Sequence, residues 1–342
     1  MSDPPHPPRA ATLDDVARVA GVSGKTVSNV LLGRGGVSEA TRARVREAVE
    51  QVGYQVQHAG RSLSSGRSRR VAVVVPMLYQ PYFATLAERL ILALAARGYS
   101  STLRIAADAA AEVAAVSGAT TAGVDGVVVA PLWTPVEELG RRAQPHLPVV
   151  QVGGVGTSPG DRVVMGEHEG ALAVARHLVE TGRRRIAVSW YSGGVRHPAD
   201  ERYAGYRRAL LEAGLPLDDA LFVAGTDTNR RRSGYASTVA LLRSGVELDA
   251  VLCVNDATAV GVLRALRTHG RRVPDDVAVT GFDDTPEARF TTPALTSVDP
   301  RQADMVAAAV QMLCERMDGL EGPGRSVRTG ADLRVRASSA PR

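Results

Sequence analysis

TLDDVARVAGVSGKTVSNVLLG, the stretch from Thr12 to Gly33, decides how the N-terminal part of this chain folds. Thr12 and Asp15 have the spacing of a capping box, which predicts the start of a helix. Gly21 permits a tight turn, and Ser23 can cap a second helix. Two short helices joined by such a turn, with a polar outer face on the second, predict a helix-turn-helix, whose second helix lies in the DNA major groove. Apolar residues recur at helical spacing in both segments, at Val16, Val19, Ala20, Val27, Val30 and Leu31.

The positive charge of the chain is concentrated in the same region. The 342 residues carry a net charge of +5, and residues 1–70 hold 11 basic and 6 acidic residues, so the remainder is neutral. A cationic head on a neutral body is the pattern expected of a nucleic-acid-binding protein. The length exceeds one typical domain, and 44% apolar residues are enough to form more than one core.

Changes in composition along the chain predict its domain boundaries. The first residues are rich in proline and are expected to be disordered. A third helix, capped by Ser38 and extending to about Val52, would complete a three-helix head. The polar and basic segment that follows, rich in Ser and Gly, is typical of a linker. The expected segments are a disordered arm (1–11), a helix-turn-helix domain (12–56), a linker (57–70), a core (71–336) and a tail (337–342).

From Val71 onward, short apolar segments alternate with helical patterns of 10–15 residues, which predicts parallel sheets wrapped by helices. About 270 residues exceed one core, so two similar lobes are expected, with a ligand crevice at the carboxyl ends of the strands. The predicted fold class is α/β, with a three-helix head and a two-lobed core. The predicted strands lie at 71–75, 102–105, 126–130, 148–152, 186–190, 221–224, 250–254 and 277–282.

A series of motifs follows in order along the chain: TLDDVARVAGVSGKTVSNVL, Gly53-Tyr54 with RSL at 61–63, VDGVVVAP, HLVETGRRRIAV, RYAGYRRAL, VNDATAVGVLRAL, VPDDVAVTGFDD and TTPALTSV. In these motifs, over residues 12–336, the chain resembles the LacI/GalR family of bacterial transcriptional regulators. The resemblance implies a periplasmic-binding-protein-like core that binds a small effector between two lobes, and a hinge helix within 57–70 that orders on DNA. It also implies a homodimer, with a tetramer as the alternative, whose paired heads bind a pseudo-palindromic operator in double-stranded DNA. Because Gly60 lowers helix propensity, the hinge is expected to be unstructured without DNA.

The resemblance places the DNA contacts in the head and the linker. Lys25 and Asn29 occupy base-reading positions, as does Gly24, which leaves one such position without a side chain. Lys25 would favour guanine, and Asn29 would favour adenine or a phosphate. The remaining expected contacts with the DNA backbone are Thr12, Ser23, Thr26 and Ser28. In the minor groove, Leu63 is expected to act as an apolar wedge, with Ala59 lining the same groove.

The effector site is expected where aromatic and polar residues follow the predicted strands. Aromatic residues make up only 4% of the chain, yet they gather at these strand ends. Arg forks and carboxylates clamp hydroxyls or ring edges, while aromatic faces stack on a ring. The family suggests a saccharide or related polyol; a purine or other small metabolite is the alternative, because Gly153 replaces an Asp found in several sugar-binding members. The expected contacts are Tyr82, Phe83, Trp133, Trp190, Arg196, Arg202, Asn255 and Asp283.

The sequence favours neither an enzyme nor a cofactor-binding protein. It contains no nucleophile-elbow order of Ser, Asp and His and no convincing set of metal ligands. Gly24-Lys25-Thr26 resembles the end of a phosphate loop, but Val19 stands where that loop requires Gly. No cofactor and no metal are therefore expected.

A solute-binding protein of a transport system, built on the same core, is the second alternative. The basic head and the missing secretory signal argue against it. Cys253 and Cys314 are expected to be buried thiols, and no apolar run has the length of a membrane span. The sequence therefore predicts a cytoplasmic regulator without a membrane partner, and repression is the expected mode.

Overall fold

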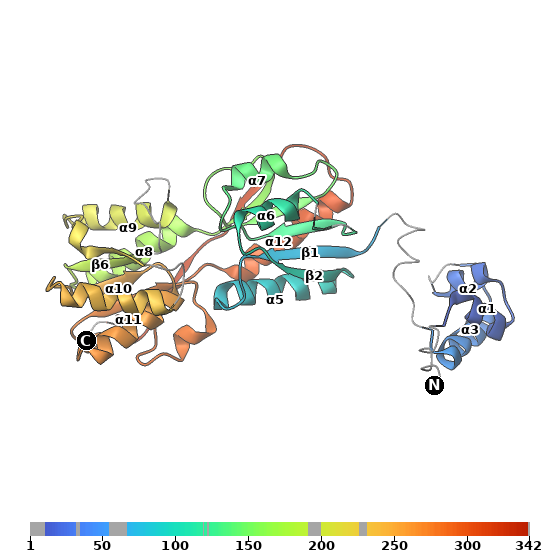
Figure 1. Cartoon of the computed structure of the whole chain (residues 1–342), viewed down its shortest axis with the longest axis horizontal. Coiled ribbons are helices and arrows are strands. Elements are labelled where there is room, and N and C mark those ends of the chain that lie inside the picture. The colour runs from blue at the N-terminus through green and yellow to red at the C-terminus, as the bar shows by residue number, and fades with distance from the viewer. Residues whose placement is uncertain are drawn as a thin grey trace, which may run out of the picture. The chain divides into compact units, whose positions relative to one another are not determined.

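The computed structural model describes residues 11–31, 35–54, 67–118, 120–121, 123–190, 200–225 and 231–340. The chain divides into two units, Met1–Ser68 and Arg69–Arg342 (Figure 1). The first unit contains a three-helix head and the second is a two-lobed core. Among the described residues, no helix is long and apolar enough to cross a membrane.

Three helices, α1 (Leu13–Ala20), α2 (Gly24–Leu31) and α3 (Glu39–Val52), form the head as the sequence predicts. The capping box is present, because Thr12 Oγ1 accepts the Asp15 N–H at 3.3 Å and the Asp15 carboxylate accepts the Thr12 N–H at 3.0 Å. Gly21 ends α1 with a φ of 63°, a left-handed conformation that glycine adopts without strain. The head core is formed by Val16, Ala20, Val27, Val30, Val45 and Ala48.

The first lobe of the core is a six-stranded parallel sheet in the order β11-β5-β4-β3-β1-β2. Side chains alternate between its two faces. In β1, Val71, Val73 and Val75 pack with α5 and α12, whereas Ala72 and Val74 pack with α6 and α7. Because helices cover both faces, the apolar run of β1 is buried at all but its first position. The strands are β1 (Arg70–Val75), β2 (Ser100–Ile105), β3 (Gly126–Val129), β4 (Val149–Val152), β5 (Asp161–Val164) and β11 (Ser326–Arg328), and the helices are α5 (Pro81–Ala96), α6 (Ala109–Val116), α7 (Val136–Arg142) and α12 (Gln302–Met317).

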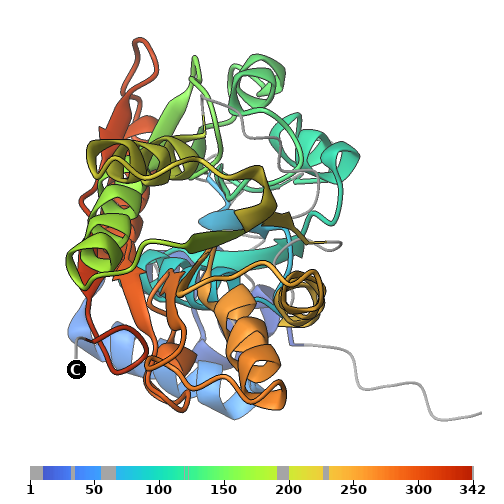
Figure 2. The ribbon, with the colours of Figure 1, turned by 90° about the vertical axis from the view of Figure 1, so that its left-hand side faces the viewer.

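The second lobe repeats this design with the strand order β12-β10-β9-β8-β6-β7, in which β12 is antiparallel to β10. In β6, Ile186 and Val188 face α8 and α9, and Ala187 faces α10 and α11. The two helix pairs lie on opposite faces of the sheet (Figures 1 and 2). The strands are β6 (Ile186–Trp190), β7 (Phe222–Ala224), β8 (Ala250–Cys253), β9 (Ala278–Phe282), β10 (Thr296–Asp299) and β12 (Asp332–Arg334), and the helices are α8 (Glu167–Glu180), α9 (Glu201–Glu212), α10 (Arg231–Arg243), α11 (Asp256–Thr268) and the short η1 (Asp219–Leu221) and η2 (Pro286–Arg289).

Three short connections join the two lobes. The chain passes from β5 to α8, from β10 to α12 and from β11 to β12. Arg301, in the second connection, binds the carboxylate of Asp332, at the end of the third, with N–O distances of 2.8 and 3.0 Å. The lobes are therefore linked by adjacent crossing segments that an ion pair ties together.

The structure corrects some expectations about secondary structure. The sequence predicts that the helix after the strand at 102–105 extends to about residue 122, whereas α6 ends at Val116. Strands β5, β10, β11 and β12 are absent from the sequence-based assignment because polar and charged residues interrupt these short segments, so they show no apolar run.

Four side chains also bear on the sequence-based expectations. Val19 is 40% exposed although it was expected on the inner face of α1, because Val16 and Ala20 face the head core and Val19 lies to one side of them. Ser338, assigned to the tail, is fully buried, and its hydroxyl donates to the Val279 carbonyl at 2.6 Å. Residues around Ser338 therefore pack into the second lobe. Both cysteines, Cys253 and Cys314, are buried and free, as expected.

Candidate functional site

The outer face of α2 carries the residues expected to read DNA. Ser23 caps the helix, since its Oγ accepts the N–H of Thr26 at 3.2 Å. The two valines of α2 point into the head core. Lys25 is consequently exposed, and Thr26, Ser28 and Asn29 are partly exposed. One side of a short helix thus presents a cation, two hydroxyls and an amide, the groups that bind phosphates and base edges.

A side chain at position 24 would lie close to α1. A Cβ added to Gly24 would lie 3.2 Å from Leu13 Cδ2 and 3.6 Å from Asp14 Oδ1. Position 24 is therefore a point of close approach between α2 and α1. Thr12 is partly exposed at the start of α1. The two residues expected in the minor groove, Ala59 and Leu63, lie outside the described residues together with the predicted hinge.

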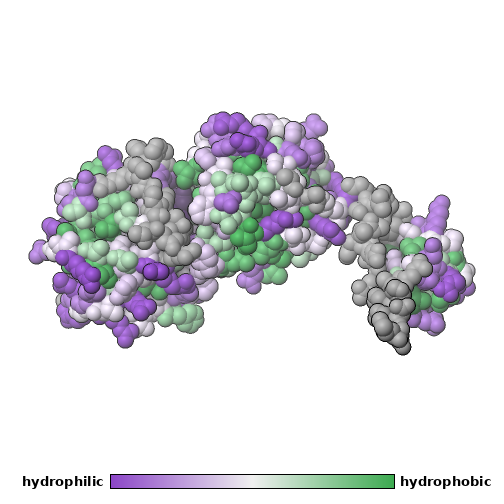
Figure 3. Space-filling view, viewed as in Figure 1, coloured by the Kyte–Doolittle hydropathy of each residue, from purple (hydrophilic) through white to green (hydrophobic). Residues whose placement is uncertain are grey.

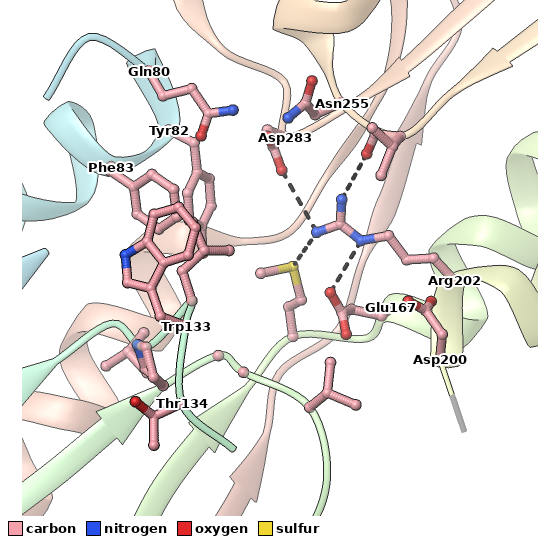
Figure 4. A pocket seen from close by; sticks show the side chains of 18 of the residues that line it. Gln80, Tyr82, Phe83, Trp133, Thr134, Glu167, Asp200, Arg202, Asn255 and Asp283 are labelled. Carbon is pink, nitrogen blue, oxygen red and sulfur yellow. Dashed lines mark hydrogen bonds and ion pairs between the residues drawn. The ribbon is translucent and has the colours of Figure 1, made fainter. Parts of the chain in front are cut away.

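A cavity of about 560 Å³ lies between the two lobes of the core. Its wall is built from residues that follow β1, β3, β4 and β5 of the first lobe and β6, β8 and β9 of the second. Because the carboxyl ends of strands from both sheets meet there, the cavity occupies the position expected of a ligand site. Of the predicted effector contacts, it brings together Tyr82, Phe83, Trp133, Arg202, Asn255 and Asp283 (Figure 4).

Trp190 is placed differently from the prediction. Its side chain is 2% exposed, and it is not among the residues that line the cavity. The ring packs edge-on against Tyr206 and lies tilted against Phe222, with centroid distances of 6.1 Å in both cases. Trp190 therefore fills the core of the second lobe beneath α9. Arg196, the other predicted contact, lies outside the described residues.

Arg202, on α9, is the centre of the polar side of the cavity (Figure 4). Its Nε donates to Glu167 Oε1 at 3.0 Å, and one terminal nitrogen donates to the Val254 carbonyl at 2.7 Å. The other terminal nitrogen lies 3.8 Å from Asp283 Oδ1. The guanidinium carbon lies 3.9 Å from the centroid of the Phe282 ring. Two carboxylates, a carbonyl and an aromatic face therefore fix the orientation of the guanidinium.

Burial and charge act in opposite directions on these groups. Burial raises the pKa of Glu167 and raises that of Asp283 well above its usual range, while Arg202 opposes both effects. Burial would lower the pKa of Arg202, but Glu167 and Asp283 more than offset it, so the pKa is raised and the guanidinium stays charged. With Asp200, the described lining residues include three carboxyl groups and one guanidinium.

The first lobe contributes an aromatic wall. Tyr82 and Phe83 lie in the first turn of α5 and pack edge to face, with ring centroids 5.1 Å apart and an interplanar angle of 80°. Gln302 Nε2 donates to the Tyr82 carbonyl at 3.1 Å, which ties this turn to α12. Trp133 is 38% exposed, and its indole N–H donates to the Ala106 carbonyl at 3.1 Å. The three rings lie across the cavity from Arg202 (Figure 4).

Backbone geometry positions the polar residues of the second lobe. Asn255 caps α11 by accepting a backbone N–H through Oδ1 at 2.9 Å. Asp283 has a φ of 104°, a conformation that costs a non-glycine residue energy. Its N–H donates to the Val298 carbonyl at 2.9 Å. The buried carboxylate of Asp256 accepts the Thr285 N–H at 2.7 Å and so holds the segment that follows Asp283.

Sequence reasoning missed several lining residues. They follow β5, a strand that the sequence did not indicate, or precede a helix without a distinctive pattern, and Glu167 follows β5 by only three positions. No group of His, Cys, Asp and Glu in the described part of the chain could hold a metal ion. The missed polar and sulfur-containing residues are Gln80, Thr134, Met165, Glu167 and Asp200.

A helix-turn-helix head and a two-lobed core with a cavity at the strand ends together define a ligand-responsive DNA-binding regulator. Residues 12–57 match the bacterial regulatory proteins of the lacI family, and residues 175–339 match the periplasmic binding protein-like domain. The chain belongs to the LacI family. Since this family consists of DNA-binding transcription regulators, the chain is a regulator and not an enzyme, as the sequence predicts.

Curated relatives match over nearly their whole length. The chain is 33% identical to the transcriptional regulator CelR of Thermobifida fusca over 330 residues, covering 91% of this chain and 93% of CelR. It is 32% identical to the transcriptional repressor PurR of Pectobacterium atrosepticum, covering 90% of each chain.

Solved structures show the same architecture. A complex of the regulator CelR with cellobiose is 32% identical, has a TM-score of 0.71 and covers 96% of this chain and 99% of its own. A LacI-family regulator from Sanguibacter keddieii is 36% identical, with a TM-score of 0.73 and coverage of 80% and 99%. The lac repressor dimer bound to operator is 24% identical with a TM-score of 0.84, covers 97% of this chain and 99% of its own, and shares the fold.

Proposed function

We propose that the chain is a cytoplasmic repressor whose operator affinity is changed by an uncharged saccharide in the cavity between the lobes. The observation that carries this proposal is the division of the cavity into an aromatic wall and a hydrogen-bonding wall centred on Arg202. Sugars have apolar ring faces and hydroxyl edges, which two such walls complement. The cellobiose complex of CelR supports the choice of a saccharide.

The charge of the cavity favours an uncharged ligand over a sugar phosphate. Glu167, Asp200 and Asp283 outnumber Arg202 among the lining residues that the structure describes. Arg202 is already engaged by Glu167, by Asp283 and by a backbone carbonyl. A phosphate would have to compete with these carboxyl groups for Arg202. A purine is the second candidate, because the three aromatic rings could also stack on a planar base.

The proposed DNA-binding residues are those on the outer face of α2. Lys25 and Asn29 would read base edges, while Thr26 and Ser28 would bind phosphates. Thr12 and Ser23 lie at the helix starts, where backbone N–H groups favour phosphate oxygens.

A homodimer would present two heads to the two halves of a pseudo-palindromic operator. The exposed edge of the first lobe supports self-association. Strand β2 is the last strand of its sheet, and Leu103 and Ile105 on it are 38% and 48% exposed. Leu92, on the neighbouring helix α5, is 63% exposed. Figure 3 shows an apolar area on the face of this lobe that carries α5 and β2. A second copy of the chain would cover these apolar side chains.

A thermal-shift series tests the effector proposal. Cellobiose and glucose represent uncharged saccharides, glucose 6-phosphate represents anionic sugars, and hypoxanthine represents purines. A ligand that binds only the folded core raises its melting temperature, by an amount that grows with the ratio of ligand concentration to Kd. We expect a rise with at least one uncharged saccharide and none with glucose 6-phosphate.

Two matched aromatic substitutions locate the site. Trp133→Phe replaces the indole of a lining residue with a smaller ring and removes its hydrogen bond to the Ala106 carbonyl, and it should reduce the saccharide-induced shift. Trp190→Phe changes a ring in the core outside the cavity, and it should lower the melting temperature without reducing the saccharide-induced shift. Equal loss of the ligand response in both variants, or a response only to glucose 6-phosphate or hypoxanthine, would contradict the proposed site and ligand.

A further inference from the structure

We infer that Glu112 is a positioning residue for effector binding, which holds loop 131–135 and thereby fixes the Trp133 ring at the cavity wall. The inference rests on the proposed function only in taking this cavity as the effector site. Glu112 lies on α6, is fully buried and does not itself line the cavity. Its effect on a ligand would therefore be transmitted through the loop.

Glu112 binds three consecutive backbone N–H groups of this loop. Oε1 accepts the N–H of Leu132 at 2.6 Å and that of Trp133 at 3.1 Å. Oε2 accepts the N–H of Trp133 at 3.3 Å and that of Thr134 at 2.8 Å. Within the part of the chain that the structure describes, no basic side chain forms an ion pair with Glu112. The buried charge is thus stabilised by backbone dipoles, and in turn it fixes the backbone.

The residue type at position 112 follows from the loop sequence. The loop reads Pro-Leu-Trp-Thr-Pro from Pro131 to Pro135, and neither proline has an N–H to contribute. The three N–H groups between the prolines point toward one place, and leaving them buried without an acceptor would be costly. A carboxylate has enough lone pairs to satisfy all three, whereas an amide offers one oxygen and a donor that would oppose them.

Packing alone does not fix the loop, because it stands between two cavities. The front of the loop faces the cavity between the lobes. Behind it lies a second, shallower hollow of about 510 Å³ between α6 and α7, which is open to solvent and is also lined by Trp133, Thr134 and Pro135. The Trp133 ring is therefore held by two polar contacts, its backbone through Glu112 and its indole N–H through the Ala106 carbonyl.

A fixed ring lowers the cost of ligand binding. If the loop were free, binding would have to order it first, and that cost would be subtracted from the interaction energy. Glu112 should therefore determine both the mobility of Trp133 without ligand and the affinity for a ligand that stacks on it.

The test compares Glu112→Gln with Asp249→Asn in the full chain. Asp249 is a matched control, because its carboxylate also accepts two consecutive backbone N–H groups, those of Arg184 at 2.7 Å and Arg185 at 3.0 Å. It directly precedes β8, at the end of the sheet opposite to the strand ends that line the cavity. Both substitutions change a carboxylate to an amide, and both should lower the melting temperature.

Acrylamide quenching of tryptophan fluorescence gives a readout that needs no ligand. Trp133 is 38% exposed and Trp190 is 2% exposed, so quenching reports chiefly on Trp133. We expect the quenching constant to rise by about twofold or more in Glu112→Gln, because the loop opens locally, and to stay at the wild-type value in Asp249→Asn. Unchanged quenching in Glu112→Gln, or the same rise in both variants, would overturn the inference.

Calorimetric titration with cellobiose adds the ligand readout. Glu112→Gln should weaken cellobiose binding by about tenfold, the equivalent of one charge-assisted hydrogen bond. In a Trp133→Ala background the same substitution should leave the affinity for cellobiose unchanged, because Glu112 acts through the Trp133 ring. A factor that persists without Trp133 would contradict the inference. If cellobiose fails to bind the wild-type chain, the choice of this saccharide fails, while the quenching result still decides the role of Glu112. If Glu112→Gln does not fold, Glu112→Asp, which keeps the charge but shortens the reach, takes its place in the quenching comparison.

Discussion

Replacing Arg202 with Met probes the electrostatic centre of the cavity. Met keeps most of the length and apolar volume of the side chain but removes its charge and its donors. Glu167 would lose a partner at 3.0 Å and Asp283 one at 3.8 Å. The Val254 carbonyl would lose a donor at 2.7 Å. The substitution therefore leaves two carboxyl groups without the cation that lies between them, so that their negative charges repel each other when both are ionised.

The expected loss of stability follows from the burial of these carboxyls. Removing one member of a buried ion pair costs about 3–5 kcal/mol, because the remaining charge is uncompensated. The side chain of Glu167 is 25% exposed and that of Asp283 is 8% exposed, so water reaches one of them in part. We therefore expect the free energy of unfolding of the core to fall by about 3 kcal/mol at neutral to alkaline pH.

The loss should depend on pH with a definite sign. Burial already raises the pKa of Glu167 and Asp283 in the folded chain, and removing Arg202 removes the main opposing influence. A carboxyl whose pKa is higher in the folded than in the unfolded state stabilises the fold at low pH, and that stability is lost as pH rises through the folded pKa. Arg202→Met should therefore destabilise the core less at about pH 5 than at about pH 8.

Scanning calorimetry of the full chain at both pH values measures this effect through the unfolding transition of the core. Arg176→Met is the matched control, because Arg176 lies on the surface of the same lobe, is 46% exposed and pairs with Glu212 at 2.7 Å. Exposed pairs contribute about 0–1 kcal/mol, so the control should show a small loss. The reasoning would be refuted by equal losses for Arg202→Met at the two pH values, or by a loss no larger than that of the control.

Three further predictions concern other parts of the molecule. Burial raises the pKa of Asp256 to about 7, so its contribution to stability should decline as pH rises through about 7. Asp256→Asn should remove that part of the pH dependence of the melting temperature. Parallel curves of melting temperature against pH for wild type and variant would contradict this prediction. Ser38 Oγ accepts the Thr41 N–H at 3.3 Å, so Ser38→Ala should destabilise the head by about 1 kcal/mol without lowering the melting temperature of the core, as followed by circular dichroism. Lys25→Ala should weaken binding to a duplex selected from a random library by about tenfold or more, and it should relax the base preference at one position. A loss of affinity that is equal for all sequences, with a shallower salt dependence, would assign Lys25 to a phosphate instead.

The head and the alternation of strands and helices could be predicted because their signals are local. The capping box of Thr12 and Asp15 and the turn at Gly21 lie within a few residues of the elements they define. The apolar runs of the central strands reflect burial on both faces of a sheet, which any such strand requires. Local chemistry therefore specified the class of fold.

The cavity wall could be predicted only in part, because it depends on contacts between distant residues. Trp190 ends a strand like other predicted contacts, but the alternation of side chains directs it under α9 instead of into the cavity. Glu167 lines the cavity and accepts a hydrogen bond from Arg202, 35 positions away, a contact that no local pattern indicates. Glu112 has no sequence signal at all, since its partners are backbone N–H groups about 20 positions further along the chain.

The central claim is that binding in the cavity and binding of DNA are linked. Fluorescence anisotropy of a labelled, selected duplex, measured with and without a saturating saccharide that binds the chain, tests this claim most directly. We predict that the saccharide changes the Kd for DNA by about fivefold or more, and that the duplex changes the Kd for the saccharide by the same factor. An operator affinity that stays the same while the cavity is demonstrably occupied would contradict the account.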